Sequence, residues 1–216
     1  MRFPWISRTL ATTRRPMASS VHTYTYEYAR PAVTVDAGLV TQEETPHVLL
    51  IRRLNDPFKG KWAFPGGFVD ADENIKTAVA RELLEETSID LLGEHRRCAI
   101  VPLQQVRTFG DDITRDPRGW CITVLYGALV DPAVKEHTKA ADDAAEAVWF
   151  PLKSPPFDAM AFDHAEMVRQ LANAMSGENE WAKAQRCIPG GVSDALRRAS
   201  RVLDPAFTGG AINPDR

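Results

Sequence analysis

Hydrophobic and polar residues alternate along several stretches of the chain in the way that half-buried β-strands require. β-Branched residues dominate 30–40, a polar break follows, and an apolar run covers 47–53 as its hairpin partner. The same reasoning gives a set of six predicted strands: 30–40, 47–53, 62–67, 98–109, 120–130 and 145–152. A polar loop over 110–119 joins two of them, and the strand at 62–67 runs into a turn formed by its two adjacent glycines.

A helical period appears in three other stretches. The first predicted helix covers 74–87, with Asn74 as its N-cap. The second covers 163–175, where Met167, Leu171 and Met175 recur at intervals of four. A third amphipathic helix is predicted over 193–203, with Ser193 as its cap. Strands that alternate with helices in this order predict an α+β fold, a mixed sheet with helices on both faces in an α/β/α sandwich.

Composition limits the classes of protein to consider. The chain has 216 residues, of which 44% are hydrophobic, and this suits one globular domain with terminal segments. Its net charge of −3 gives no general attraction to polyanions, so no nucleic-acid partner is predicted. No apolar run reaches the roughly 20 residues that span a bilayer, so no membrane partner is predicted either. The odd set Cys98, Cys121 and Cys187 lacks a CxxC pair, which favours a reducing compartment over disulfides or zinc.

The N-terminal segment differs from the rest of the chain. Residues 1–26 contain no acid and carry Arg2, Arg8, Arg14 and Arg15 among many hydroxyl residues. This composition is typical of a transit peptide for a mitochondrion or plastid. The alternatives are a disordered basic leader, or initiation at Met17 and a cytoplasmic protein. The predicted domain is then 27–176, followed by a partly helical or mobile extension over 177–216.

Three carboxylates crowd one face of the helix at 74–87. Glu82, Glu85 and Glu86 stand at i, i+3 and i+4, where like charges cost about 0.2–0.5 kcal/mol per pair. Arg81 offsets part of this by pairing with Glu85. A solvated charged face is the simplest interpretation. The glycines just before the helix favour a second one, because they let the backbone approach a ligand and hard cations such as Mg²⁺ bind carboxylate and carbonyl oxygens.

The spacing of these residues resembles the signature of the Nudix hydrolase family, G-x5-E-x7-R-E-U-x-E-E-x-G-U, where U is a bulky aliphatic residue. Eight of its nine specified positions agree without a gap: Gly67, Glu73, Arg81, Glu82, Leu83, Glu85, Glu86 and Ile89. Ser88 stands where the family has the glycine that ends the helix. If Ser88 keeps a positive φ, it costs about 1–2 kcal/mol.

The resemblance implies roles for the residues of this signature. Glu82, Glu85 and Glu86, with the Gly66 carbonyl, would coordinate Mg²⁺, or alternatively Mn²⁺, and turnover would be most sensitive to Glu85 and Glu86. The set with an expected structural role is Gly67, Glu73 and Arg81. The activity implied is hydrolysis of a phosphoanhydride in a nucleoside diphosphate derivative.

Three stretches outside the signature resemble the ADP-ribose pyrophosphatase-like branch: "RPAVTVD" (30–36), "TFGDDITRDPRGW" (108–120) and "AFDHAEMV" (161–168). They imply ADP-ribose as substrate, with AMP and ribose 5-phosphate as products, and a homodimer as an assembly to test. The alternatives are hydrolysis of NADH, another dinucleotide or a nucleoside triphosphate. A further alternative is an ADP-ribose-sensing transcription regulator, against which the complete set of carboxylates and the short tail argue.

Residues that would recognise the substrate are less well marked. The candidate guanidinium groups are Arg52, Arg53, Arg115 and Arg118, and each is equally well read as a solvated loop charge. Candidates for an extra metal ligand, a general base or a substrate contact are Asp111, Asp112, Asp116 and Glu146. His164 is expected to form a hydrogen bond at a helix start rather than to act as a base. Trp62 and Phe64 are expected in the core.

Overall fold

The computed structural model describes residues 26–176 and 190–203. Residues up to Arg30 form a unit of their own, and all the elements below belong to the unit that begins at Pro31. The predicted transit segment, apart from Tyr26, and Cys187 lie outside the described residues. No helix in the described ranges is long and apolar enough to cross a membrane.

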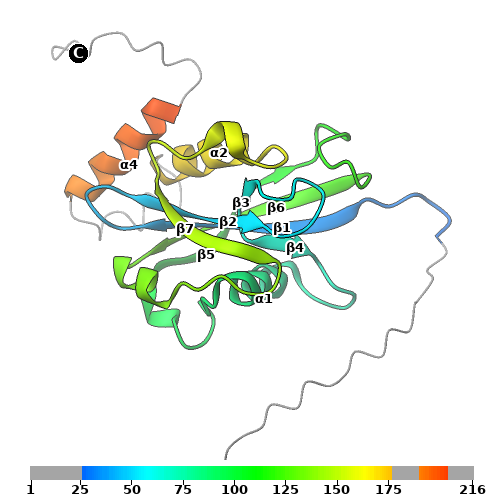
Figure 1. Ribbon diagram of the computed structural model, residues 1–216, viewed down its shortest axis with the longest axis horizontal. Helices are drawn as coiled ribbons and strands as arrows, with labels where there is room; N and C mark the ends of the chain where they lie inside the picture. Colours follow the sequence, from blue (N-terminus) through cyan, green and yellow to red (C-terminus); the bar gives the residue numbers. More distant parts are fainter. Residues whose placement is uncertain (1–25, 177–189, 204–216) are drawn as a thin grey trace, which may run out of the picture. The chain divides into compact units, whose positions relative to one another are not determined.

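Seven strands form one mixed sheet (Figure 1). Their bounds are β1 Ala32–Thr41, β2 His47–Arg53, β3 Trp62–Ala63, β4 Gly66–Phe68, β5 Ala99–Phe109, β6 Cys121–Val130 and β7 Ala144–Pro151. The strand order is β3-β2-β1-β6-β5, with β4 paired to β1 and β7 paired to β2. β1 and β6 are parallel along their whole length, whereas the other pairs are antiparallel. The predicted mixed sheet is confirmed.

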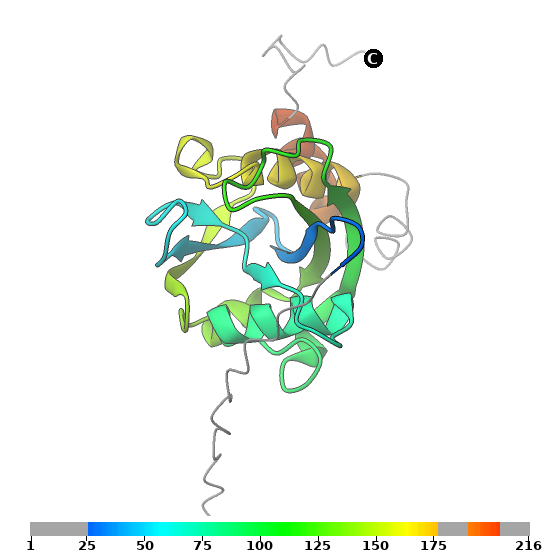
Figure 2. The ribbon, with the colours of Figure 1, turned by 90° about the vertical axis from the view of Figure 1, so that its right-hand side faces the viewer.

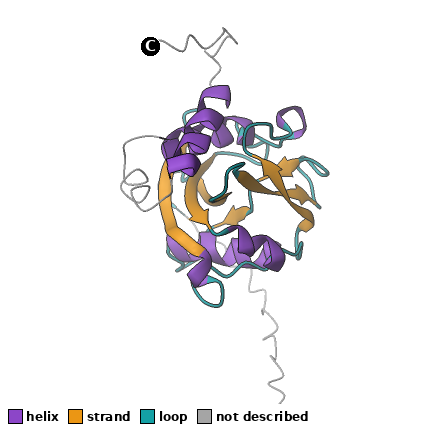
Figure 3. Cartoon of the chain, turned by 90° about the vertical axis from the view of Figure 1, so that its left-hand side faces the viewer, coloured by secondary structure: helices purple, strands orange, loops and turns teal. Residues whose placement is uncertain are grey.

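Helices cover both faces of this sheet. Helix α1 (Ile75–Thr87) lies on one face, and α2 (His164–Ser176) and α4 (Gly190–Leu203) lie together on the other, as Figures 2 and 3 show from opposite sides. Three short 3₁₀ helices occupy connections: η1 Arg96–Cys98, η2 Pro132–His137 and η3 Phe157–Ala159. Ser193 lies inside α4 rather than at its start, so the predicted cap is wrong.

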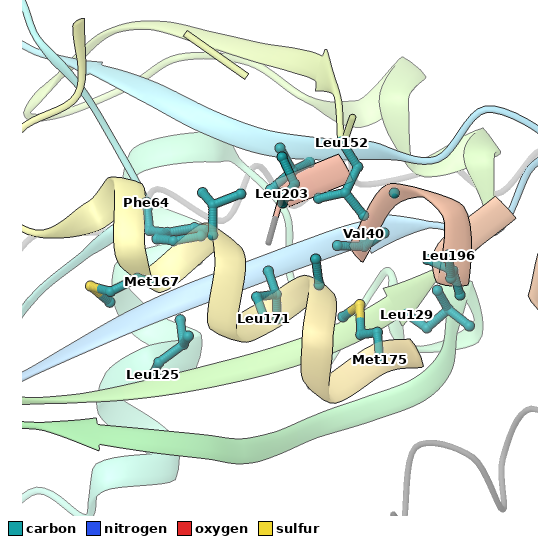
Figure 4. Packing of buried hydrophobic residues seen from close by; sticks show 14 of the residues in the cluster. Val40, Phe64, Leu125, Leu129, Leu152, Met167, Leu171, Met175, Leu196 and Leu203 are labelled. Carbon is teal, nitrogen blue, oxygen red and sulfur yellow. The ribbon is translucent and has the colours of Figure 1, made fainter. Parts of the chain in front are cut away.

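The alternation along β1 divides the core into two layers. Val35, Ala37 and Leu39 pack with the apolar face of α1, whereas Val40 points to α2 and α4. On that second side, α4 contributes Leu196, Ala199 and Leu203 to the core, and Figure 4 shows Leu196 and Leu203. The helix predicted after residue 176 is therefore present as α4, and it also forms part of the core.

Gly66 and Gly67 belong to a strand rather than to a turn. They pair with Asp36 and Val35 of β1, and the bend falls at Pro65 instead. A Cβ on Gly66 would lie 2.1 Å from the Val35 carbonyl oxygen, so only glycine lets β4 approach β1 this closely. A Cβ on Gly67 would lie 2.4 Å from Glu82 Oε1. The predicted turn is wrong because the glycines serve strand pairing and the approach of α1.

Both ends of α1 are fixed as the sequence predicts. The Asn74 side chain accepts a hydrogen bond from the Thr77 N–H at 2.9 Å, so Asn74 is the N-cap. Ser88 has φ 62° and ψ 13°, and its N–H donates to the Leu84 carbonyl. This is the left-handed conformation that a C-terminal glycine would adopt at no steric cost.

The left-handed Ser88 leads to a stability prediction. Ser88→Gly should stabilise the protein by about 1 kcal/mol, because it removes the Cβ strain at positive φ and loses only a 3.4 Å hydrogen bond to the Lys139 carbonyl. For a protein of this size the melting temperature should rise by about 2–4 °C. Thermal unfolding monitored by circular dichroism measures it. A lower melting temperature in the variant would contradict the strain argument.

Candidate active site

A cleft opens where the end of β2, strand β4, helix α1 and the loops that carry Arg118 and Asp142 meet. Its volume is about 290 Å³, and its lining is Arg53, Leu54, Asn55, Gly66, Gly67, Phe68, Asp70, Glu82, Glu86, Arg118, Asp142 and Asp143. A narrower polar recess shares Arg53, Gly66, Gly67 and Arg118 with the cleft and reaches Asp36 and His164 behind them. Two carboxylates of α1 and two guanidinium groups thus line the same cleft.

Glu86 is the most buried carboxylate of α1. It is only 5% exposed, and its Oε2 accepts a hydrogen bond from the Gly66 N–H at 2.8 Å. Burial raises the pKa of Glu86 to about 8, and the negative charge of Glu82 adds to the rise despite that hydrogen bond. Burial also raises the pKa of Glu82. Glu82 is paired with Arg81, whereas the described part of the chain shows no salt bridge to Glu86, so Glu86 lacks the positive charge that normally accompanies a buried carboxylate.

Arg81 joins α1 to the segment that precedes it. Its guanidinium donates to both Glu73 oxygens, at 3.0 and 2.9 Å, and to the Phe68 carbonyl at 3.0 Å. It also donates to Glu82 at 2.7 Å and to Glu85 at 3.1 Å. The hydrogen bonds with Glu73 are the main cause of the raised pKa of Arg81. Glu85, whose side chain is 44% exposed, is held by Arg81 outside the lining of the cleft.

The residues present suit a divalent cation. In the described part of the chain no three acidic, histidine or cysteine side chains already enclose an ion position, because Arg81 engages both Glu82 and Glu85. A cation would have to compete with this guanidinium. Yet Glu86 is buried beside Gly66, and its raised pKa is the response of a carboxylate without a cationic partner. Oxygen donors of this kind are the ligands that Mg²⁺ and Mn²⁺ bind.

Two arginines form the opposite side of the cleft. Arg118 lies over the Phe68 ring at 4.6 Å and makes hydrogen bonds to the buried Asp116 as short as 2.6 Å. Arg53 lies 5.1 Å from the Phe162 ring and donates to the Pro57 carbonyl at 2.8 Å. Burial lowers the pKa of Arg53, and the positive charge of Arg118 lowers it further. The two like charges thus repel each other and would favour an anion between them.

The other arginine and aspartate candidates do not line the cleft itself. Arg52 pairs with Glu146 at 2.7 Å in an exposed position, and the buried Arg115 is bound to Asp163. The Asp112 carboxylate accepts hydrogen bonds from Thr114 and caps its own loop. Asp111 and Asp112 line a separate hollow of about 200 Å³. Arg52 and Asp112 are therefore placed away from the cleft, whereas Arg115 lines the recess behind it and is held there by Asp163.

Four acids that line the cleft or its recess were not among the predicted site residues: Asp36, Asp70, Asp142 and Asp143. Asp36 is 6% exposed and accepts a hydrogen bond from Thr123 Oγ1 at 2.5 Å. Asp142 and Asp143 reach the cleft because backbone hydrogen bonds tie their loop to the end of α1, from Lys139 to Thr87 and from Ala141 to Glu86. A lone acid in the apolar strand 30–40 was a usable signal for Asp36. Nothing in the sequence distinguishes Asp142 and Asp143 from solvated loop acids.

His164 and the two aromatic candidates occupy buried or half-buried positions. The His164 Nδ1 accepts a hydrogen bond from the Phe64 N–H at 2.9 Å, at the start of α2. Phe64 is 1% exposed, and Trp62 packs edge-on against Phe150. The expected hydrogen bond at the helix start and the expected core packing are both present.

Most of the chain matches a known protein family. The NUDIX domain family matches residues 30–171, which is well over half of the chain. The chain belongs to the NUDIX domain family. The Nudix resemblance deduced from the signature is thereby confirmed, and so is the Nudix fold class.

Relatives of this Nudix protein include proteins whose names refer to ADP-ribose. The ADPR responsive transcriptional repressor NtrR of Acinetobacter baylyi is 36% identical over 158 residues, which cover 72% of this chain and 58% of the repressor. The ADP-ribose pyrophosphatase of Methanocaldococcus jannaschii is 36% identical over 150 residues, which cover 69% of this chain and 78% of that enzyme. The chain thus spans little more than half of the repressor's length.

Solved structures that match this chain also include proteins whose descriptions name ADP ribose. The NUDIX domain of Shewanella oneidensis NrtR, in complex with ADP ribose, matches with a TM-score of 0.55 and 31% identity, covering 68% of this chain and 90% of that one. A bifunctional NMN adenylyltransferase/ADP ribose pyrophosphatase from Francisella tularensis, with AMP and a manganese ion, matches with a TM-score of 0.57 and 32% identity. That match covers 68% of this chain and 43% of the other.

Proposed function

We propose that this Nudix protein is a divalent-cation-dependent pyrophosphohydrolase and that its preferred substrate is ADP-ribose. Water would add across the phosphoanhydride, so that one phosphate leaves with the adenosine as AMP and the other as ribose 5-phosphate. The observation that carries the proposal is the cleft itself, in which carboxylates of α1 face Arg53 and Arg118. A diphosphate bridged to a cation fits between such walls.

The chain's own groups divide the work in this proposal. Glu82 and Glu86, with the Gly66 carbonyl and with Glu85 once released from Arg81, would hold the cation. When bound there, Mg²⁺ supplies positive charge for the phosphate oxygens and lowers the pKa of a coordinated water. Arg118 is held in place by Asp116 and two aromatic rings, and it presents its charge to the phosphates at little cost in side-chain entropy.

The substrate assignment has a direct test. The hydrolysis rates of ADP-ribose, NADH, FAD and nucleoside triphosphates are measured with Mg²⁺ and with Mn²⁺. We expect the highest kcat/KM for ADP-ribose, because relatives whose names refer to ADP-ribose match about two thirds of this chain. A kcat/KM for NADH or a triphosphate about tenfold higher, equivalent to about 1.4 kcal/mol in transition-state binding, would refute ADP-ribose and leave the Nudix activity intact.

The two arginines Arg118 and Arg52 provide a matched pair for the same assay. Arg118→Ala should raise KM for ADP-ribose, since Arg118 lines the cleft, whereas Arg52→Ala should not, since Arg52 pairs with Glu146 on the surface. Each change removes one guanidinium, so a difference between their effects on KM reports the position of the arginine and not the loss of a charge. Equal effects of the two substitutions would show that the cleft arginine does not bind substrate.

A regulatory function is the second candidate, and the match to a transcriptional repressor is the observation that favours it. In that case ADP-ribose would bind without turnover, and the protein would bind duplex DNA with an affinity that falls steeply with salt. Calorimetry with ADP-ribose and electrophoretic mobility shifts at two salt concentrations separate the two functions. Salt-dependent DNA binding together with absent hydrolysis would favour the regulator.

A further inference from the structure

The imidazole of His164 connects α2 to the segment between β3 and β4, which leads into Gly66. Its Nδ1 accepts a hydrogen bond from the Phe64 N–H at 2.9 Å, although the two residues are 100 positions apart. Two residues after Phe64, the Gly66 N–H donates to Glu86 Oε2 at 2.8 Å. Between them, the Pro65 carbonyl accepts from the Ala37 N–H at 2.8 Å. The segment 64–66 is therefore fixed by three successive contacts to α2, β1 and α1.

The hydrogen bond from Phe64 also determines the protonation state of the ring. Because Nδ1 accepts, the neutral imidazole carries its proton on Nε2. That nitrogen lies 3.6 Å from Asp36 Oδ1. Burial lowers the pKa of His164, which keeps the ring neutral and Nδ1 available as an acceptor.

Asp36 brings the other side of the ring to the same segment. It pairs with Gly66 across β1 and β4, and a Cβ on Gly66 would come within 2.9 Å of Asp36 Oδ1. His164 thus contacts the start of the segment through Nδ1 and faces, through Nε2, the carboxylate that lies against its end. The ring is 4% exposed, so no solvent replaces these contacts.

We propose that His164 is a positioning residue for the divalent-cation site: as a neutral acceptor for the Phe64 N–H, it fixes the Phe64–Gly66 segment so that the Gly66 carbonyl can face the carboxylates of α1. The proposal rests on the metal-dependent function proposed above. His164 does not touch substrate or cation in this role. Its neighbours Asp36, Asp163, Arg115 and Arg53 set the charge around the ring.

Two substitutions by amide side chains distinguish the roles of the two ring nitrogens. In His164→Asn the amide oxygen takes the place of Nδ1 and still accepts from Phe64, whereas in His164→Gln the amide reaches only the Nε2 position. Binding of Mn²⁺ to each variant is measured from the electron paramagnetic resonance signal of free Mn²⁺. We expect His164→Asn to keep the wild-type Kd within about twofold, and His164→Gln to weaken it about ten- to a hundredfold, as loss of a supporting hydrogen bond does in metal sites.

Leu171→Ala serves as the stability control. Leu171 is fully buried in the same helix, two turns from His164, and it lines neither the cleft nor its recess. The substitution should lower the melting temperature while the Kd for Mn²⁺ stays at the wild-type value. An equal loss of Mn²⁺ affinity in Leu171→Ala would overturn the proposal, because general destabilisation would then explain the result.

Other results would also overturn the positioning role of His164. Equal Kd values in His164→Asn and His164→Gln would overturn the positioning role, whereas wild-type protein that neither binds Mn²⁺ nor hydrolyses a nucleotide would overturn the proposed function as well. Imidazole ¹⁵N NMR of the wild-type protein needs no variant to fold. A protonated Nδ1 at neutral pH would overturn the proposal directly.

Discussion

Glu86→Gln should lower kcat by at least about 10²-fold with any nucleotide substrate that the protein hydrolyses. Glu86 is the carboxylate that the fold buries in the cleft, against the Gly66 N–H, and Gln keeps its size and helix propensity while removing its charge. Loss of one electrostatic stabiliser in an active site typically has an effect of this size. Steady-state kinetics at saturating Mg²⁺ measures it. Glu85→Gln is expected to act in the same direction once Mg²⁺ displaces Arg81.

In the absence of metal, the same substitution should stabilise the folded protein, although it lowers kcat. Folding raises the pKa of Glu86 from about 4.5 to about 8, so its contribution to stability is complete below pH 4.5 and is lost as the pH rises through 8. Gln does not titrate. In excess chelator Glu86→Gln should therefore become increasingly more stable than the wild type between pH 4.5 and pH 8, and added Mg²⁺ should stabilise only the wild type.

Two results would count against this account of the metal site. One is near-normal turnover in both Glu86→Gln and Glu85→Gln, or full wild-type activity in excess chelator. The other is a melting temperature of Glu86→Gln that lies below that of the wild type in chelator at pH 8. The first would remove the metal assignment, whereas the second would show that the Glu86 charge is satisfied by the protein alone.

Leu196→Ala should destabilise the protein by about 2–5 kcal/mol, the usual range for removing a buried leucine side chain. Leu196 is 1% exposed and joins the core formed by α2, Val40 and Leu129 (Figure 4). Urea unfolding followed by circular dichroism gives the free energy. The effect is large because α4 completes a core layer that would otherwise face water.

Arg201→Ala is the matched control on the same helix. Arg201 is exposed, so its truncation should change the free energy of unfolding by no more than about 0.5 kcal/mol. Equal and small effects of the two substitutions would show that α4 is not part of the cooperative core in solution. The predicted domain boundary at residue 176 would then stand.

The sequence predicted most of the local structure of this protein. Strand alternation and the Asn74 cap are determined by residues close together in the chain, and both agree with the structure. The left-handed Ser88 was considered only because the family has a glycine at that position. The Nudix signature was also readable, because its residues lie in one continuous stretch of the chain, 67–89. For the same reason the ion pairs of Arg81 with Glu73 and Glu85 could be anticipated in part from the spacing.

The use of the two glycines could not be predicted in this way. Their role depends on β1, some thirty positions earlier, and on the Glu82 side chain of α1, which lies against Gly67. A pair of glycines has the same local preference for a turn or for a close strand pairing. Only the tertiary contact decides between the two.

The sequence by itself determined the elements, the family and the carboxylates of α1. Tertiary structure alone decided which arginines reach the cleft: Arg53 and Arg118 do. The neighbouring Arg52 pairs with Glu146 at the surface, and Arg115 is held by Asp163 in the recess behind the cleft. Tertiary structure also brought Asp36 and His164 together behind Gly66. The physical reason is that a charged side chain is placed by its partner, and these partners lie up to 128 positions away in the chain, from Asp36 to His164.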